Sequence, residues 1–288
     1  MSGIDTSFFI ETRKGFHAAL FKSGILSTDA AGISSIADKG SAVSCKLAHG
    51  ITSRLGEEVV GAKLAGQMSG NEFESIVGKF VEETFPRLKS IRPGNFTVLK
   101  GKSRLAIAAA DQYSHLGSLD ILARENPELA VAIGMDYIIK PDVMVLRSPV
   151  SDAEINLTEN VVDDSVAKLT TLRLANNPLP LLHASISCKW TLRSDRAQNA
   201  RSEALNLVRN RKGRVPHIVV VTAEPMPNRL ASIALGTGDI DCVYHIALPE
   251  LRAAIDENKY EDAAALLETM IVGKRLRDIS DLPLDLAT

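Results

Sequence analysis

Two carboxylates and one lysine in this chain could together cleave a phosphodiester bond. Asp142 follows Pro141 at the start of a predicted strand, Lys189 lies near the end of another strand, and Glu203 follows in a predicted helix. Metal-assisted phosphodiester cleavage needs at least two carboxylates to hold a divalent ion, and a cation near the attacking water. The sequence therefore predicts a metal-dependent hydrolytic site built from these three side chains.

The spacing departs from the common nuclease pattern PD…(D/E)xK at one position. Ser187 stands two residues before Lys189, where that pattern has an acid, and a serine does not supply the missing negative charge. Glu203 supplies it if the helix after the strand runs back past the site. Arg196 and Glu203 are seven residues apart, which is about two helical turns, so both would lie on one face of that helix.

These residues also carry a resemblance to a known family. Asp142, the run Ser187-Cys188-Lys189, the run RSDR at 193–196 and Glu203 resemble the variant active site of the tetrameric type II restriction endonucleases that cut at CCGG cores. The matching motifs extend over residues 38–229. The resemblance implies a restriction-endonuclease-like (PD-(D/E)XK) α/β core, with a mixed central sheet flanked by helices. It also implies Mg²⁺-dependent cleavage of double-stranded DNA at GCCGGC, after the first G, with four-base 5′ overhangs.

The run Arg193, Asp195 and Arg196 has the chemistry needed to read such a core. An arginine reads guanine through O6 and N7, and a carboxylate accepts a hydrogen bond from the cytosine N4 amino group. Each half of CCGG holds two G·C pairs, so two arginines and one aspartate meet that demand. The alternative is that Asp195 caps the helix and the arginines are surface charge. The neighbouring Lys189 and Glu203 favour the DNA-reading interpretation.

The resemblance implies a role for each catalytic residue. Asp142 and Glu203 would bind Mg²⁺ through their side chains, and Cys188 would bind it through its backbone carbonyl. Lys189 would orient or deprotonate the attacking water and stabilise the pentacovalent phosphate. A nucleophilic role for Cys188 is an alternative, but no His–Asn or His–Asp pairing is apparent beside it.

An accessory acid and several DNA contacts are implied as well. In the run GNEFE at 70–74 the accessory acid would be Glu74, and Glu72 is its competitor. Glu74 is preferred because it follows a phenylalanine that packs inward. The remaining DNA contacts implied are Gln67 in the minor groove, Arg229 at the outer guanine, Asp38 at the outer cytosine, and Ser187.

Composition and charge narrow the class of protein. The 288 residues are 45% hydrophobic and 24% charged, which excludes a disordered or fibrous chain. Cys45, Cys188 and Cys242 form no CxxC and no zinc-ligand spacing, which fits a reducing bacterial cytoplasm. No apolar run approaches the ~20 residues of a membrane span, and the first residues lack a secretory signal, so we expect no membrane partner.

Local charge differs from the total. The formal net charge is −2, yet residues 187–214 hold eight Lys or Arg and two acids. Such a window is either a solvated basic helix or part of a DNA-binding surface. A palindromic DNA site calls for a two-fold dimer, and the resemblance implies a homotetramer made of two such dimers.

The elements that must position these residues follow from hydrophobic periodicity. Residues 1–125 are expected to be mostly helical, with helices over 71–85 and 104–125, the first ended by Pro86. Residues 126–288 are expected to form the catalytic and recognition core, and the whole chain one endonuclease domain. The strands expected there are 136–146 (interrupted at Pro141), 182–190, 217–222 and 241–248, and the helices are 195–209, 228–235 and 251–270.

Two other functions stay open on the sequence alone. A sequence-specific DNA-binding protein that does not cut would use the same R-x-D-R run without the metal-binding acids. A structure-specific repair or recombination nuclease of the same fold would need the acids but not that run. Within the restriction-enzyme interpretation, RCCGGY is the natural alternative to GCCGGC.

Overall fold

The computed structural model describes residues 7–56, 66–101, 105–134, 138–236 and 238–288, except for the side chains of residues 66–68 and 194. A six-stranded sheet forms its centre, with the strands side by side in chain order. Strands β1, β2 and β3 pair antiparallel, whereas β3, β4, β5 and β6 run parallel. The strands are β1 Phe96–Lys100, β2 Val143–Arg147, β3 Leu181–Lys189, β4 His217–Thr222, β5 Cys242–His245 and β6 Leu276–Asp278.

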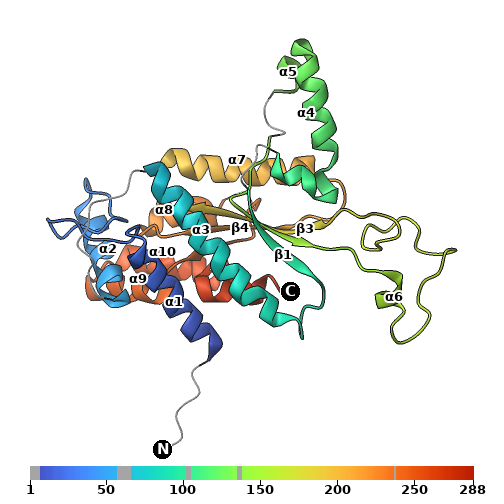
Figure 1. The fold of residues 1–288 in the computed structure, drawn as a ribbon. Coiled ribbons are helices and arrows are strands. Elements are labelled where there is room, and N and C mark those ends of the chain that lie inside the picture. Colours follow the sequence, from blue (N-terminus) through green and yellow to red (C-terminus); the bar gives the residue numbers. More distant parts are fainter. Residues whose placement is uncertain (1–6, 57–65, 102–104, 135–137, 237) are drawn as a thin grey trace, which may run out of the picture.

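Helices cover both faces of this sheet (Figure 1). Helix α3 crosses β1, β2 and β3, and α1 packs on α3, where the rings of Phe16 and Phe80 lie 5.2 Å apart. Elsewhere α2 packs on α9, and α10 on α8 and α9. The helices are α1 Phe8–Lys22, α2 Ala42–Leu55, α3 Gly66–Thr84, α4 His115–Glu125, α5 Pro127–Ile133, α6 Asp152–Ile155, α7 Ser194–Asn210, α8 Pro227–Ala234, α9 Leu248–Glu257, α10 Glu261–Val272 and α11 Leu282–Asp285.

The unbroken apolar strands explain why the sheet is covered on both faces. Every residue of β4 after His217 is buried, as is every residue of β5. Parallel strands of this kind need helices on both sides, because neither of their faces meets water. The mixed α/β class with flanking helices, expected from the sequence, is therefore confirmed.

Several predicted elements differ from the structure at specific contacts. The helix expected over 104–125, of which residue 104 lies outside the described residues, is instead two short 3₁₀ turns, Ala106–Ala109 and Asp111–Tyr113, followed by α4. The backbone N–H of Asp111 donates to the Pro180 carbonyl, and the Gln112 side chain bonds to both backbone groups of Leu182. These bonds tie the segment to the start of β3 and interrupt the helix.

The second long helix, expected over 251–270, is also divided. Lys259 has a φ of +54°, a conformation that no helix continues, so α9 ends before it and α10 begins after it. Of the strand expected over 136–146, residues 136 and 137 lie outside the described residues, and the rest is reduced to β2. Strands β1 and β6 were not expected. Since β1 pairs with β2, the N-terminal part is not purely helical but contributes the edge of the sheet.

An arm formed by residues 148–180 leaves the sheet between β2 and β3 (Figure 1). It contains the short helix α6 and is held at its base by Arg173, whose guanidinium bonds twice to Asp152 at 2.6 Å. Among the described residues, no helix has the length and apolar content that crossing a membrane requires.

Candidate active site

The sheet topology brings the predicted catalytic residues to one edge. Strand β2 runs antiparallel to β3, with Val143 opposite Ile186, so Asp142 just before β2 lies beside residues 187–189 at the end of β3. Gly101 makes this corner possible. Its N–H donates to the Asp142 carbonyl at 3.1 Å, and a Cβ on Gly101 would lie only 1.7 Å from the Pro141 carbonyl oxygen.

Helix α7 covers the place where Asp142 lies beside residues 187–189. It begins directly after β3 and runs back over the sheet, with Ala200 and Ala204 buried against it. Small side chains at these positions let the helix approach closely, and Glu203 between them reaches Ser187, whose Oγ donates to Glu203 Oε2 at 3.1 Å. Glu203, which lies fourteen residues after Lys189 in the chain, therefore reaches the site because α7 folds back over the sheet.

Lys189 and Ser187 bridge the two carboxylates. The Lys189 Nζ atom lies 3.2 Å from Asp142 Oδ2 and 3.5 Å from Glu203 Oε2. The Ser187 Oγ atom lies 3.5 Å from the same Asp142 oxygen. The backbone N–H of Cys188 donates to that oxygen at 2.7 Å, which fixes the orientation of the aspartate.

The helix α3 adds a third carboxylate, Glu74. Phe73 anchors this part of the helix, because its ring packs against that of Trp190 at 5.0 Å, just beyond β3. Glu74 is half-buried beside the cluster and interacts electrostatically with Asp142 and Lys189. Glu72 is exposed and lines a groove between α1 and α3 instead. The geometry thus favours Glu74 over its competitor.

The cluster holds more acidic than basic side chains. Burial raises the pKa of Glu74 to about 7, with the negative charge of Asp142 as the next cause. Burial also raises the pKa of Glu203, and the attraction of Lys189 opposes that rise. For Lys189, burial lowers the pKa, but Asp142 and Glu203 outweigh it and hold the pKa above its usual value. Three acids surround one ammonium group, an environment that a divalent cation would neutralise.

The donor set fits a hard cation such as Mg²⁺, which prefers carboxylate, carbonyl and water oxygens. Among the residues that the structure describes, no three His, Cys, Asp or Glu side chains form a ready-made metal centre. Two carboxylates with a backbone carbonyl and DNA oxygens would make up such a site. Burial raises the pKa of the Cys188 thiol well above its usual value, which argues against a thiolate nucleophile.

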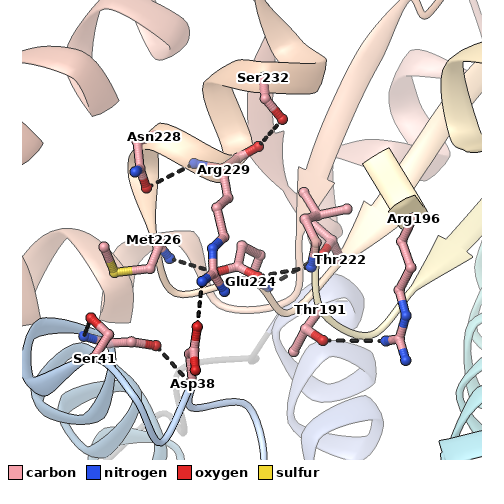
Figure 2. A network of polar contacts seen from close by, with 12 residues as sticks. Asp38, Ser41, Thr191, Arg196, Thr222, Glu224, Met226, Asn228, Arg229 and Ser232 are labelled. Carbon is pink, nitrogen blue, oxygen red and sulfur yellow. Dashed lines mark hydrogen bonds and ion pairs between the residues drawn. The ribbon is translucent and has the colours of Figure 1, made fainter. Parts of the chain in front are cut away.

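The run predicted to read bases lies at the beginning of α7. Arg193 occupies the N-cap position with extended backbone (φ −82°, ψ 162°) and makes no side-chain cap bond, so Asp195 is not the capping residue. Arg193 and Asp195 are exposed. The Arg196 guanidinium is half-buried and donates to Thr191 Oγ1 at 3.2 Å (Figure 2).

Arg229 and Asp38, predicted to contact the outer base pair, contact each other. The Arg229 guanidinium, at the start of α8, donates to the Asp38 carboxylate in the loop before α2 (Figure 2). Both side chains keep about a third of their surface exposed, 30% and 31% respectively. The hydrogen bond from Arg229 holds the pKa of Asp38 below its usual value. The side chain of Gln67 lies outside the described residues, although its backbone belongs to α3.

Glu224 is a residue that the sequence analysis missed. Its side chain is fully buried between the segments that lead into α7 and α8, where Oε2 accepts from the Leu192 N–H at 2.8 Å and Oε1 from the Met226 N–H at 3.1 Å. Arg229 Nη1 lies 3.7 Å from the same Oε1 (Figure 2). An acid two residues after a buried valine-rich strand and directly before a proline is the signal that could have revealed it.

The mixed α/β fold, with acids and a lysine gathered at one end of its sheet, matches the class of protein that the sequence predicts, an α/β nuclease. A family model described as the NgoMIV restriction enzyme matches residues 16–288. The type II restriction enzyme NgoMIV of Neisseria gonorrhoeae is 56% identical over 281 residues, which cover 97% of this chain and 98% of that protein. The chain belongs to the NgoMIV restriction enzyme family. It is thus a type II site-specific deoxyribonuclease that acts on double-stranded DNA.

Proposed function

We propose that this enzyme recognises GCCGGC and hydrolyses the phosphodiester bond after the first G, leaving four-base 5′ overhangs, with Mg²⁺ as its cofactor. One observation carries the proposal: Asp142, Lys189 and Glu203 lie together at the same edge of the sheet where the R-x-D-R run forms the beginning of α7. A duplex lying along this edge would meet base-reading and bond-cleaving groups at the same time.

Each side chain of the cluster has a distinct task in this proposal. Bound Mg²⁺ would polarise the scissile phosphate and acidify a water molecule. Asp142, Glu203 and the carbonyl of Cys188 would hold it, and the Cys188 N–H keeps Asp142 oriented. Lys189 would hold the attacking water and offset charge on the phosphate, with Glu74 as the accessory acid.

Sequence recognition would be divided between two helix N-termini. Arg193 and Arg196 would read the two guanines of each CCGG half, and the exposed Asp195 would accept from the cytosines. The pair Arg229 and Asp38 would read the outer G·C pair, since one donates and the other accepts. Gln67 and Ser187 would make further DNA contacts.

The active form would be a homotetramer made of two dimers, with the whole chain acting as one endonuclease domain in the bacterial cytoplasm. A palindrome needs two copies of the reading surface, which supports the dimer. The arm supports further association, because Leu157 and Leu169 are 81% and 95% exposed there. Light scattering would give a tetramer mass; a dimer with full activity on one-site DNA would refute the tetramer.

The test is digestion of a plasmid with two GCCGGC sites, with Mg²⁺ or with EDTA, followed by sequencing of the ends. Cuts within GCCGGC that require Mg²⁺ and leave four-base 5′ overhangs are the expected result. Cuts at other CCGG sites would refute the roles of Arg229 and Asp38. Binding to CCGG without cutting would refute the catalytic assignment, and cutting of plasmids without CCGG would refute the recognition assignment.

A further inference from the structure

A cluster of cationic side chains lies at the end of the sheet opposite to the candidate active site. A cavity of about 330 Å³ is lined there by Arg92, Arg147, Lys212 and Arg214, together with Thr171 of the arm. Arg147 ends β2, whereas Asp142 precedes its start. Leu181 of the same cavity begins the nine-residue strand β3, so the catalytic Lys189 is roughly 26 Å away at 3.3 Å per residue.

These cations lack the counter-charges that surface arginines usually have. Within the described part of the chain, no carboxylate forms an ion pair with Arg92, Arg147, Lys212 or Arg214. One acid, Asp111, lines the cavity, and it accepts a hydrogen bond from Asn177. The cavity is thus strongly cationic.

Two of the guanidinium groups also have unmet hydrogen bonds. The Nε atoms of Arg92 and Arg147 are buried and have no hydrogen-bond partner. Burial, then the like charges of Arg147 and Arg214, lower the pKa of Arg92. A buried donor without an acceptor is costly, and a cluster of like charges adds to that cost. Both costs would fall if an anion entered.

The backbone is shaped to leave room for this arrangement. Gly94 has a φ of +137°, and a Cβ there would lie 3.1 Å from the Nε atom of Arg147. The guanidinium also lies over the ring of Phe96, with its carbon 5.9 Å from the ring centre. These contacts hold Arg147 at the cavity wall instead of leaving it free in solvent.

We infer that this cavity is an anion-binding site for a phosphate-class oxyanion, separate from the DNA-cleaving site. Arg92 and Arg147 would bind the oxyanion through their planar forks, and Lys212 and Arg214 would close the rim. The volume has room for roughly ten water molecules at 30 Å³ each, enough for phosphate or pyrophosphate. Because Thr171 belongs to the arm, a bound anion would join the arm to the sheet.

Isothermal titration of the full-length protein with inorganic phosphate and with pyrophosphate tests this inference. Chloride replaces the ligand at constant ionic strength in the reference. Binding is expected, and Arg92→Gln and Arg147→Gln should each weaken it at least tenfold, because each removes a charge-assisted contact. Arg124→Gln, which removes an equal charge on α4, should leave binding unchanged. A much higher affinity for pyrophosphate than for phosphate would identify a nucleotide-like ligand. Similar affinities for the two would identify free phosphate.

Two results would overturn the inference. One is the absence of saturable binding to the wild-type protein. The other is binding that survives both arginine substitutions but disappears in Lys189→Ala, which would place the anion in the cleavage site. If Arg147→Gln unfolds, Arg147→Lys keeps the charge without the planar fork and should still weaken binding. Cleavage by these variants should stay within twofold of wild type, since neither arginine lies near the catalytic cluster.

Discussion

Substitution of Glu224 by glutamine should lower the specificity of DNA recognition, although Glu224 itself is buried and would not contact DNA. The carboxylate accepts from the Leu192 N–H with one oxygen and from the Met226 N–H with the other. A glutamine has one oxygen, so one of these donors would face an NH₂ group. The variant also lacks the negative charge that stands 3.7 Å from Arg229.

The expected size follows from these contacts. A buried donor without an acceptor costs about 1–3 kcal/mol, and 1.4 kcal/mol is a factor of ten. Loss of these bonds would distort the segment that leads into α7, which contains Leu192, and the turn that begins α8, which contains Met226. We therefore expect kcat/KM on GCCGGC to fall by a factor of roughly ten to a hundred. Preference for GCCGGC over ACCGGT should shrink, because Arg229 loses its second anchor.

Quenched-flow cleavage of two short duplexes, one with each site, measures both quantities. Glu257→Gln is the matched control, because it removes an exposed carboxylate that pairs with Arg54 on α2 and α9, away from α7 and α8. Thermal unfolding is followed in parallel. If Glu224→Gln lowered Tm but left the ratio of the two kcat/KM values at the wild-type level, Glu224 would be a structural residue only, and the reasoning would be refuted.

Three further outcomes are expected. Lys189→Ala should lower kcat by about 10²–10⁴ while a gel-shift assay still shows binding to GCCGGC; cleavage at the wild-type rate would exclude its catalytic role. Gly101→Ala should abolish cleavage and lower Tm, because its Cβ would meet the Pro141 carbonyl at 1.7 Å; a fully active variant would contradict this. Burial raises the pKa of Asp278, but Arg13 outweighs burial and holds the pKa below the ordinary 3.8. The stabilisation from this pair is therefore fully present above pH 3.8 and is lost as the pH falls through the pKa of the folded state. Arg13→Gln should thus lower the free energy of unfolding by about 2 kcal/mol or more at pH 7, with the difference narrowing in acid; an equal difference at both pH values would refute the link.

Strong local patterns were predictable from the sequence. The strand β4 and the helix α7 were predicted nearly to their ends, because β4 is an unbroken apolar run and the apolar residues of α7 recur at helical spacing. The break at Lys259 and the 3₁₀ turns before α4 were not. Gln112 bonds to Leu182, seventy residues away, and no local pattern reveals such a partner.

The residue types of the site were likewise readable in the chain, and their meeting was predicted on the condition that the helix after β3 folds back over the sheet. Asp142, Lys189 and Glu203 could be named because acids and a lysine in a nuclease-like order suit one chemistry. Glu224 escaped notice because its role depends on burial between two segments that are separate in sequence. The cationic cavity escaped notice for the same reason, since Arg92 and Arg214 meet only in the folded chain.

By itself the sequence determined the chemical inventory: the acids, the lysine, the R-x-D-R run and the strand and helix periods. The tertiary structure decided where these groups meet. Strands β3 and β4 are parallel, so α7 and α8 both begin at the same edge, where the antiparallel β2 also starts. That edge collects Asp142, Lys189 and the first residues of α7 and α8, because strand direction depends on long-range pairing and not on local sequence.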